Sequence, residues 1–160
     1  MNSLHKVVIV EDERHSLEAL KNMIIEFFPG LKVVGVASDI ENAVNTLHQH
    51  NPDIVFLDIE LNPGTGFDVI TQTRDLQYAV IFTTAYEQYA IQAIRFSSVD
   101  YLLKPVDLDE LRSAIDKAGR IISDQRRNLQ IDLLLENLKS ENNLQRKICF
   151  ASSEGLEFFN

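Results

Sequence analysis

Acidic, hydroxyl and ammonium side chains follow four short apolar runs in this sequence of 160 residues. Glu11 and Asp12 follow the first of these runs, Asp58 the second, Thr84 the third and Lys104 the fourth. Carboxylates crowded into one pocket repel one another and need a cation, and oxygen ligands without His or Cys favour a hard ion such as Mg²⁺. A carboxylate beside this ion and an ammonium group can attack phosphorus, because both cations neutralise charge on the transferring group.

The apolar pattern predicts the elements that position these side chains. Continuous apolar runs are typical of strands buried on both faces of a parallel sheet. The predicted strands are residues 7–10, 31–37, 54–57, 79–82 and 99–103. Segments with one apolar face predict a helix after each strand. These helices span residues 17–27, 40–47, 66–75, 87–96 and 108–122, with ends that are approximate.

Strand and helix alternate five times, which predicts an α/β fold with an open parallel sheet and helices on both faces. If the strand order is 2-1-3-4-5, the first, third, fourth and fifth strands are neighbours. Their carboxyl ends then bring the polar side chains to one edge, where ligands bind in sheets of this kind. Ser38 and Glu41 have capping-box spacing at the second helix, and Asp107 and Glu110 have the equivalent spacing at the fifth.

The composition narrows the functional classes. The formal net charge is −9, and an acidic domain repels nucleic acid, so any contact with DNA has to come from elsewhere. No apolar run approaches the roughly 18 to 20 residues that span a bilayer. A single cysteine, Cys149, cannot form an intrachain disulfide. We therefore expect a cytoplasmic protein without membrane contact.

Residues 1–122 resemble the receiver domain of two-component response regulators. The matching motifs are Val-Ile-Val-Glu11-Asp12, Val-Phe-Leu-Asp58, Phe-Thr-Thr84-Ala85 and Tyr101-Leu-Leu-Lys104-Pro105. Each motif is weak alone, but all of them occur in order and at compatible spacing. The resemblance implies a doubly wound (βα)5, flavodoxin-like sheet of order 2-1-3-4-5.

The resemblance also implies a role for each site residue. Asp58 is the phosphoacceptor, and Thr84 and Lys104 complete the catalytic set. Thr84 and Tyr101 are the switch residues, which move after phosphorylation, and the Lys104–Pro105 bond is cis. The implied ligands of Mg²⁺ are Glu11, Asp12, Asp58 and, through its backbone carbonyl, Glu60. Two features depart from the commonest pattern: Glu11 replaces an aspartate, and Pro63 lies one place later than usual.

The function implied is a phosphorylation-dependent switch rather than an enzyme with a separate substrate. A sensor histidine kinase supplies the phosphoryl group, and the receiver catalyses its own phosphorylation and dephosphorylation. Phosphorylation is expected to favour a homodimer, and DNA binding is expected only through a missing output domain.

The C-terminal quarter indicates how the domains are organised. The segments around Tyr86 and Tyr89 and around Tyr101 resemble receivers of the LytR/AlgR subfamily, whose output domain (LytTR) is mostly β and binds DNA. We expect a receiver at 1–122, a helical linker at 123–146 without a sustained heptad repeat, and the start of a truncated LytTR domain at 147–160. The last segment is predicted to form strand, turn and strand, beginning with Ile148 to Ala151.

Other functions remain open at this point. A degenerate receiver acting only as a protein docking module is disfavoured by the complete set of Asp12, Asp58, Thr84 and Lys104. An aspartyl-phosphate hydrolase needs an aspartate two residues after its nucleophile, where this chain has Glu60. A nucleotide or flavin module needs a glycine-rich loop after the first strand, and residues 11–14 are Glu-Asp-Glu-Arg instead.

Overall fold

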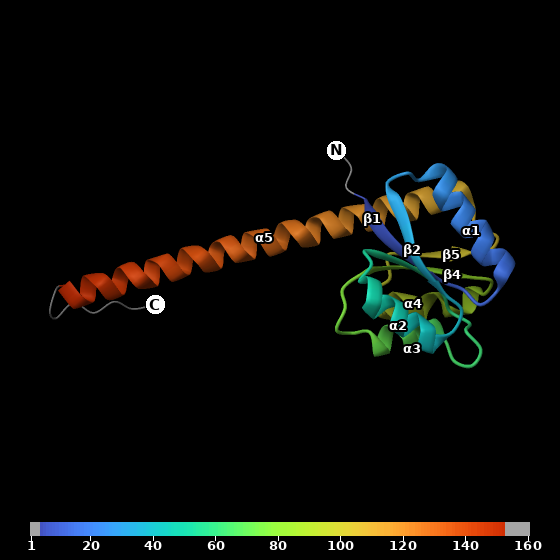
Figure 1. The fold of residues 1–160 in the computed structure, drawn as a ribbon, viewed down its shortest axis with the longest axis horizontal. Helices are drawn as coiled ribbons and strands as arrows, with labels where there is room; N and C mark the ends of the chain where they lie inside the picture. The colour runs from blue at the N-terminus through green and yellow to red at the C-terminus, as the bar shows by residue number, and fades with distance from the viewer. Residues whose placement is uncertain (1–3, 153–160) are drawn as a thin grey trace. The chain divides into compact units, whose positions relative to one another are not determined.

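The computed structural model describes residues 4–152, with side chains up to residue 140. Strands and helices alternate along this part of the chain (Figure 1). The strands are β1 (His5–Val10), β2 (Leu31–Ala37), β3 (Ile54–Asp58), β4 (Ala79–Thr84) and β5 (Asp100–Leu103). The helices are α1 (Arg14–Phe27), α2 (Ile40–His50), α3 (Gly66–Gln72), the 3-10 turn η1 (Glu87–Tyr89), α4 (Ala90–Arg95) and α5 (Leu108–Ser152).

The chain divides into two compact units, Met1–Ile122 and Ser123–Asn160. The first unit contains the whole sheet and the start of α5. The second unit contains the rest of α5, which is its one described element. Among residues 4–152, no helix combines the length and the apolar content that a bilayer crossing requires.

The five strands form one parallel sheet in the order β2-β1-β3-β4-β5, which confirms the predicted fold class and strand order. Val10 pairs with Leu57, so the residues that follow β1 lie beside Asp58 at the end of β3. Asp58 pairs in turn with Thr83 of β4. Parallel pairing in this register therefore gathers the strand ends at one edge of the sheet.

Alternate residues of the buried strands face two separate cores. Val7, Ile9 and Phe56 pack with apolar residues of α1 and of α5 up to Ile122. Val8, Val55 and Phe82 belong instead to the core that α2, α3 and α4 cover. Each face of the sheet is thus covered by a buried apolar core, as the unbroken apolar runs predicted. Each buried aliphatic side chain contributes roughly 1.5 to 3 kcal/mol to the free energy of folding.

Two predicted helix details differ from the structure. The cap of α2 is Asp39 rather than Ser38, and its Oδ1 accepts a hydrogen bond from the Asn42 N–H at 2.8 Å. Aspartate caps a helix as well as serine does, so the start moves by one residue. The predicted helix at 87–96 is divided into η1 and α4. The cap at Asp107 is confirmed, since its Oδ2 accepts from the Glu110 N–H at 3.1 Å.

The strand predicted from Ile148 to Ala151 is wrong, because these residues lie inside α5. A lone hairpin lacks the further strands that would stabilise it, whereas a helix extends by one hydrogen bond for each residue added. The rest of the predicted turn and second strand, at 153–160, lies outside the described residues.

His48 joins α2 to the segment after α3 through both of its ring nitrogens. Nδ1 lies 2.9 Å from the backbone carbonyl of Val44, and Nε2 lies 2.9 Å from Asp75 Oδ2. Both partners are acceptors, and only the protonated ring donates from both nitrogens. The Val44 carbonyl, followed by the Asp75 carboxylate, raises the pKa of His48.

We expect an NMR titration to give His48 a pKa above its ordinary value of about 6.5, and Asp75→Asn to lower it. Because the folded-state pKa is raised, the contact stabilises the fold fully below the unfolded-state pKa and is lost as pH rises through the folded-state pKa. Asp109→Asn, which removes an equal charge from α5, is the control. An identical His48 pKa in Asp75→Asn and the wild type would contradict this contact.

Candidate functional site

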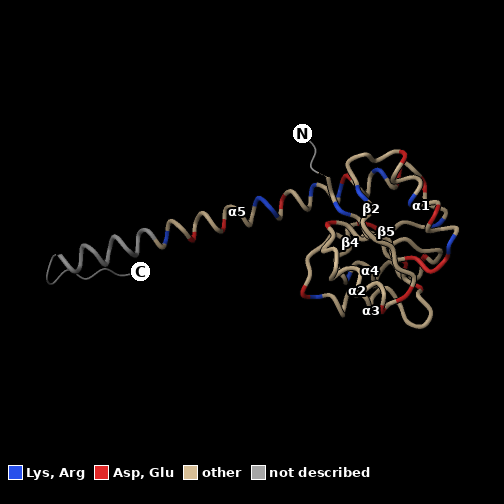
Figure 2. The backbone as a smooth tube through the Cα atoms, viewed as in Figure 1, with Lys and Arg blue, Asp and Glu red and all other residues tan. Residues whose placement is uncertain are grey.

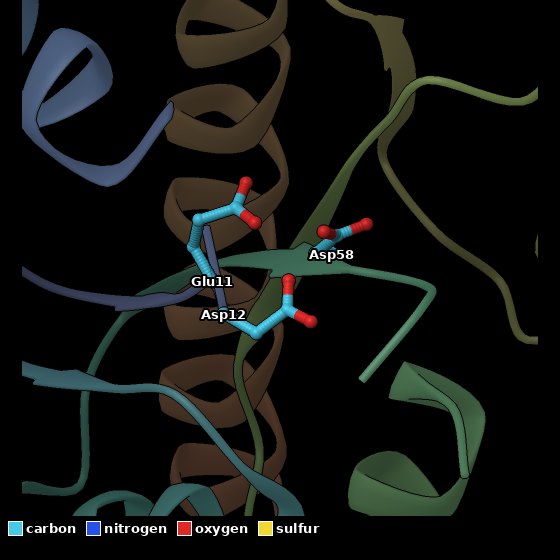
Figure 3. Close-up of side chains that lie close together, drawn as sticks. All are labelled: Glu11, Asp12 and Asp58. Atoms are coloured by element: carbon cyan, nitrogen blue, oxygen red, sulfur yellow. The ribbon is translucent and has the colours of Figure 1, made fainter. Parts of the chain in front are cut away.

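Three carboxylates meet where β1 and β3 end (Figure 3). Glu11 and Asp12 follow β1, and Asp58 is the last residue of β3. Each offers one oxygen, and the three oxygens lie within 4.8 Å of one another. Glu11 and Asp58 are buried, whereas Asp12 is exposed. The site therefore combines two carboxylates removed from water with a third at the solvent boundary.

Lys104 lies against the two buried carboxylates. Its Nζ forms an ion pair with Glu11 Oε1 and lies 3.1 Å from Asp58 Oδ2. The backbone N–H of Lys104 donates to the Thr84 carbonyl at 2.8 Å, which fixes the lysine at the end of β5. Burial opposes its charge, but the hydrogen bond to Glu11 and the charge of Asp58 outweigh this effect and raise the pKa of Lys104.

One ammonium group does not balance the negative charge of the site. Burial, followed by contact with Asp58, raises the pKa of Glu11 to about 7, although Lys104 acts in the opposite direction. Burial is the main cause of this raised pKa, so a cation at the site would stabilise the ionised carboxylate. Because all three donors are carboxylate oxygens, the site suits a hard divalent cation.

The loop after β3 fixes the position of Asp58. The Glu60 N–H donates to Asp58 Oδ1 at 3.3 Å, and the Gly66 N–H donates to the Ile59 carbonyl at 2.7 Å. A Cβ atom on Gly66 would lie 2.5 Å from the backbone oxygen of Asp58. Glycine is therefore required at 66 to let the start of α3 approach the strand end.

The two predicted switch residues are connected through the backbone of Tyr86. The Tyr86 N–H donates to Thr84 Oγ1 at 3.3 Å, and the Tyr86 carbonyl accepts a hydrogen bond from the Tyr101 hydroxyl. Thr84 is fully buried, and the ring of Tyr101 lies 6.5 Å from that of Phe82. A movement of the Thr84 side chain would therefore affect the position of Tyr101 through the backbone of Tyr86.

This backbone link could not be predicted from the sequence, because any residue other than proline at 86 supplies the same N–H and carbonyl. A second contact was also missed: the Tyr89 hydroxyl donates to Glu60 Oε1 at 3.0 Å. It joins the loop after β3 to η1 across 29 residues of sequence. The hydrogen bond to Glu60 raises the pKa of the Tyr89 hydroxyl.

A cavity of about 240 Å³ lies beside Lys104. It lies between residues of α1 and those around the Lys104–Pro105 bond, which is cis as predicted. Its lining residues are Glu11, Glu13, His15, Ser16, Ala19, Leu20, Met23, Thr83, Lys104, Pro105 and Val106. The buried carboxylate of Glu11 is therefore reachable from this side.

The structure brings together Glu11, Asp12, Asp58 and Lys104, all of which were predicted from the sequence as site residues. Thr84 lies at the end of the neighbouring strand β4. The backbone N–H of Glu60 is at the site, while its carbonyl as a metal ligand stays a prediction. The position of this pocket places the chain in the class of doubly wound α/β domains, whose ligands bind at the carboxyl ends of the strands.

Comparisons with known proteins agree with this class. Residues 7–116 match the family model of the response regulator receiver domain. Sensory transduction protein LytT of Bacillus cereus is 37% identical over 114 residues, which are 70% of this chain and 46% of that protein. The chain thus spans about half the length of this curated relative.

Two solved structures share the fold. The REC domain of AraT, a response regulator from Geobacillus stearothermophilus, is 30% identical with a TM-score of 0.67 over 76% of this chain and 98% of that chain. The signal receiver domain of a modulated diguanylate cyclase from Desulfovibrio desulfuricans G20 is 28% identical with a TM-score of 0.68, over 77% and 99%. The chain belongs to the response regulator receiver domain family, and LytT proteins are among its relatives.

We expect Gly66→Ala to destabilise the fold by about 1 to 3 kcal/mol, because its methyl group would overlap the Asp58 carbonyl. Gly30→Ala is the matched control, since a Cβ there meets nothing within 4 Å. The free energy of unfolding in urea measures both changes. Equal stability of the two variants would show that Gly66 does not set the approach of α3 to Asp58.

Proposed function

We propose that this receiver takes a phosphoryl group onto Asp58 with Mg²⁺ bound, and that phosphorylation switches its dimerisation. The observation that carries the proposal is the environment of the Asp58 carboxylate. It is buried, it has Lys104 Nζ at 3.1 Å, and it shares the site with Glu11 and Asp12. Membership of the response regulator family supports a sensor histidine kinase as the phosphodonor.

The proposed reaction joins Asp58 to phosphorus and releases the donor. A carboxylate oxygen of Asp58 forms a new O–P bond while the P–N bond of a phosphohistidine breaks, and the bonding electrons remain on the imidazole. Lys104 stabilises the charge on the transferred oxygens as a point charge. Hydrolysis of the acyl phosphate returns Asp58, so the chain acts on itself rather than on a separate substrate.

The proposed ligands of Mg²⁺ are Glu11, Asp12, Asp58 and the Glu60 carbonyl. The carboxylate oxygens of Glu11, Asp12 and Asp58, which lie within 4.8 Å of one another, support this set, as does its all-oxygen chemistry. When bound, Mg²⁺ supplies charge neutralisation for the carboxylates and for the phosphoryl group. Asp12 is exposed while Asp58 is buried, which gives the ion a path from solvent.

The proposed switch passes from Asp58 to Tyr101. Thr84 Oγ1 accepts its hydrogen bond from Tyr86 N–H, and a phosphoryl group on Asp58 would offer this hydroxyl a new acceptor. Rotation of Thr84 would release Tyr86, whose carbonyl holds the Tyr101 hydroxyl. A local gain of negative charge is thereby coupled to the surface around η1, α4 and β5.

The proposal also covers the linker and the output domain that follow the receiver. We assign residues 123–146 to a helical linker and place a LytTR-type output domain beyond Ser152, where the described part of α5 ends. DNA contact would come only from that domain, because the chain is acidic. A docking module without phosphorylation is the alternative, and the close approach of Lys104 to Asp58 favours the phosphorylated switch over it.

Intact-protein mass spectrometry after incubation with acetyl phosphate and Mg²⁺ tests the acceptor. We expect the wild type to gain one phosphoryl group, and Asp58→Asn or wild type in EDTA to gain none. Asp109→Asn, which removes an aspartate of α5, is the control and should react as the wild type does. A wild type that gains nothing, with or without Mg²⁺, would leave the docking module as the function.

Thr84→Val and Thr84→Ser separate phosphorylation from switching. The valine variant keeps the volume and loses the hydroxyl, so we expect phosphorylation of Asp58 without the accompanying dimer. The serine variant keeps the hydroxyl and should dimerise. Sedimentation velocity with and without acetyl phosphate measures the dimer. Full dimerisation of phosphorylated Thr84→Val would show that the hydroxyl is not the switch.

A further inference from the structure

Every residue of α5 from 123 to 140 is exposed, although the segment is rich in leucine. Its large apolar side chains are about half exposed, namely Leu129, Ile131, Leu133, Leu134, Leu135 and Leu138. Within residues 123–152, α5 is the sole element described, so this part of the chain provides nothing to cover them. Large apolar side chains exposed in this number on one helix segment indicate a surface for another chain.

Four positions on this segment have the spacing of a coiled-coil seam. Asn128 and Leu135 are seven residues apart, and so are Ile131 and Leu138, with intervals of three and four residues alternating. This spacing places Asn128 and Leu135 at a positions and Ile131 and Leu138 at d positions on one face of the helix. The exposed Leu133 lies on the opposite face, at an f position.

The polar residue and the flanking charges favour a second copy of this chain as the occupant. Asn128 would face its own counterpart, and asparagine at an a position specifies paired helices in register. Arg127 occupies a g position and Asp132 the next e position. In a parallel pair, Arg127 of each copy meets Asp132 of the other, whereas antiparallel helices pair g with g and e with e.

We propose that residues 128–138 of α5 form a parallel, in-register seam with a second copy of this chain. Asp124, at the preceding d position, would face its own charge and therefore limits the seam at its N-terminal end. In the single chain, Arg127 is only 4.0 Å from Asp124 in an exposed pair, which costs little to exchange.

The seam is about 16 Å long and too short to hold two helices together by itself. The proposal therefore rests on the proposed function in one respect: receivers that pair on phosphorylation raise the effective concentration of one linker around the other. The seam then forms in the phosphorylated dimer and sets a symmetric spacing for whatever follows α5.

Disulfide cross-linking locates the seam. Leu135→Cys and Leu133→Cys, each in a Cys149→Ser background, are matched because their leucines are 54% and 52% exposed. Cysteines at paired a positions come close enough for a disulfide, while those at f positions do not. In the 160-residue protein treated with acetyl phosphate and Mg²⁺, we expect Leu135→Cys to cross-link at least about tenfold faster than Leu133→Cys.

The outcomes separate the seam from the proposed function. Equal cross-linking rates at 135 and 133, in the phosphorylated and in the concentrated unphosphorylated protein, would overturn the seam. Faster cross-linking at 135 without any phosphorylation of Asp58 would support the seam and contradict the proposed function. Charge reversal adds a second readout: Arg127→Glu or Asp132→Arg should slow cross-linking at 135, and the double variant should restore it, since residues five apart are not neighbours within one helix.

Discussion

Two buried carboxylates and one ammonium group at the strand ends form the interaction on which the rest of this structure depends. Glu11 and Asp58 would repel each other strongly in a site removed from water, and Lys104 Nζ contacts both. Even with Lys104 in contact, burial, followed by the contact with Asp58, raises the pKa of Glu11 to about 7. Three carboxylate oxygens within 4.8 Å of one another are suited to a hard divalent cation, which would reduce the repulsion between them.

The sheet supplies the rigid frame that such a site needs. Val10 pairs with Leu57, and Asp58 with Thr83, so the polar residues lie side by side at the buried ends of β1, β3 and β4. Acidic residues outnumber basic ones in the first unit, with 18 Asp and Glu against 10 Lys and Arg in residues 1–122, and Figure 2 shows both signs there and along α5.

Much of the fold and of the site could be predicted from the sequence. A doubly wound sheet requires buried strands, which appear as unbroken apolar runs, and the polar residues that follow these runs mark the site. The links through Tyr86 and between Tyr89 and Glu60 could not, because backbone hydrogen bonds and long-range contacts leave no local pattern. The strand at Ile148 to Ala151 was predicted from β-favouring residues, whereas the structure continues α5 through them. Local propensity alone is weak, and within residues 123–152 the structure describes no strand for this segment to pair with.

The most direct test of the central claim is to locate the phosphoryl group. After reaction with acetyl phosphate and Mg²⁺, borohydride reduces a phosphorylated aspartate to homoserine, and tandem mass spectrometry of the peptides identifies its position. The account predicts homoserine at position 58 and none in protein treated with EDTA. Homoserine at position 12, or at another aspartate in place of 58, would contradict it.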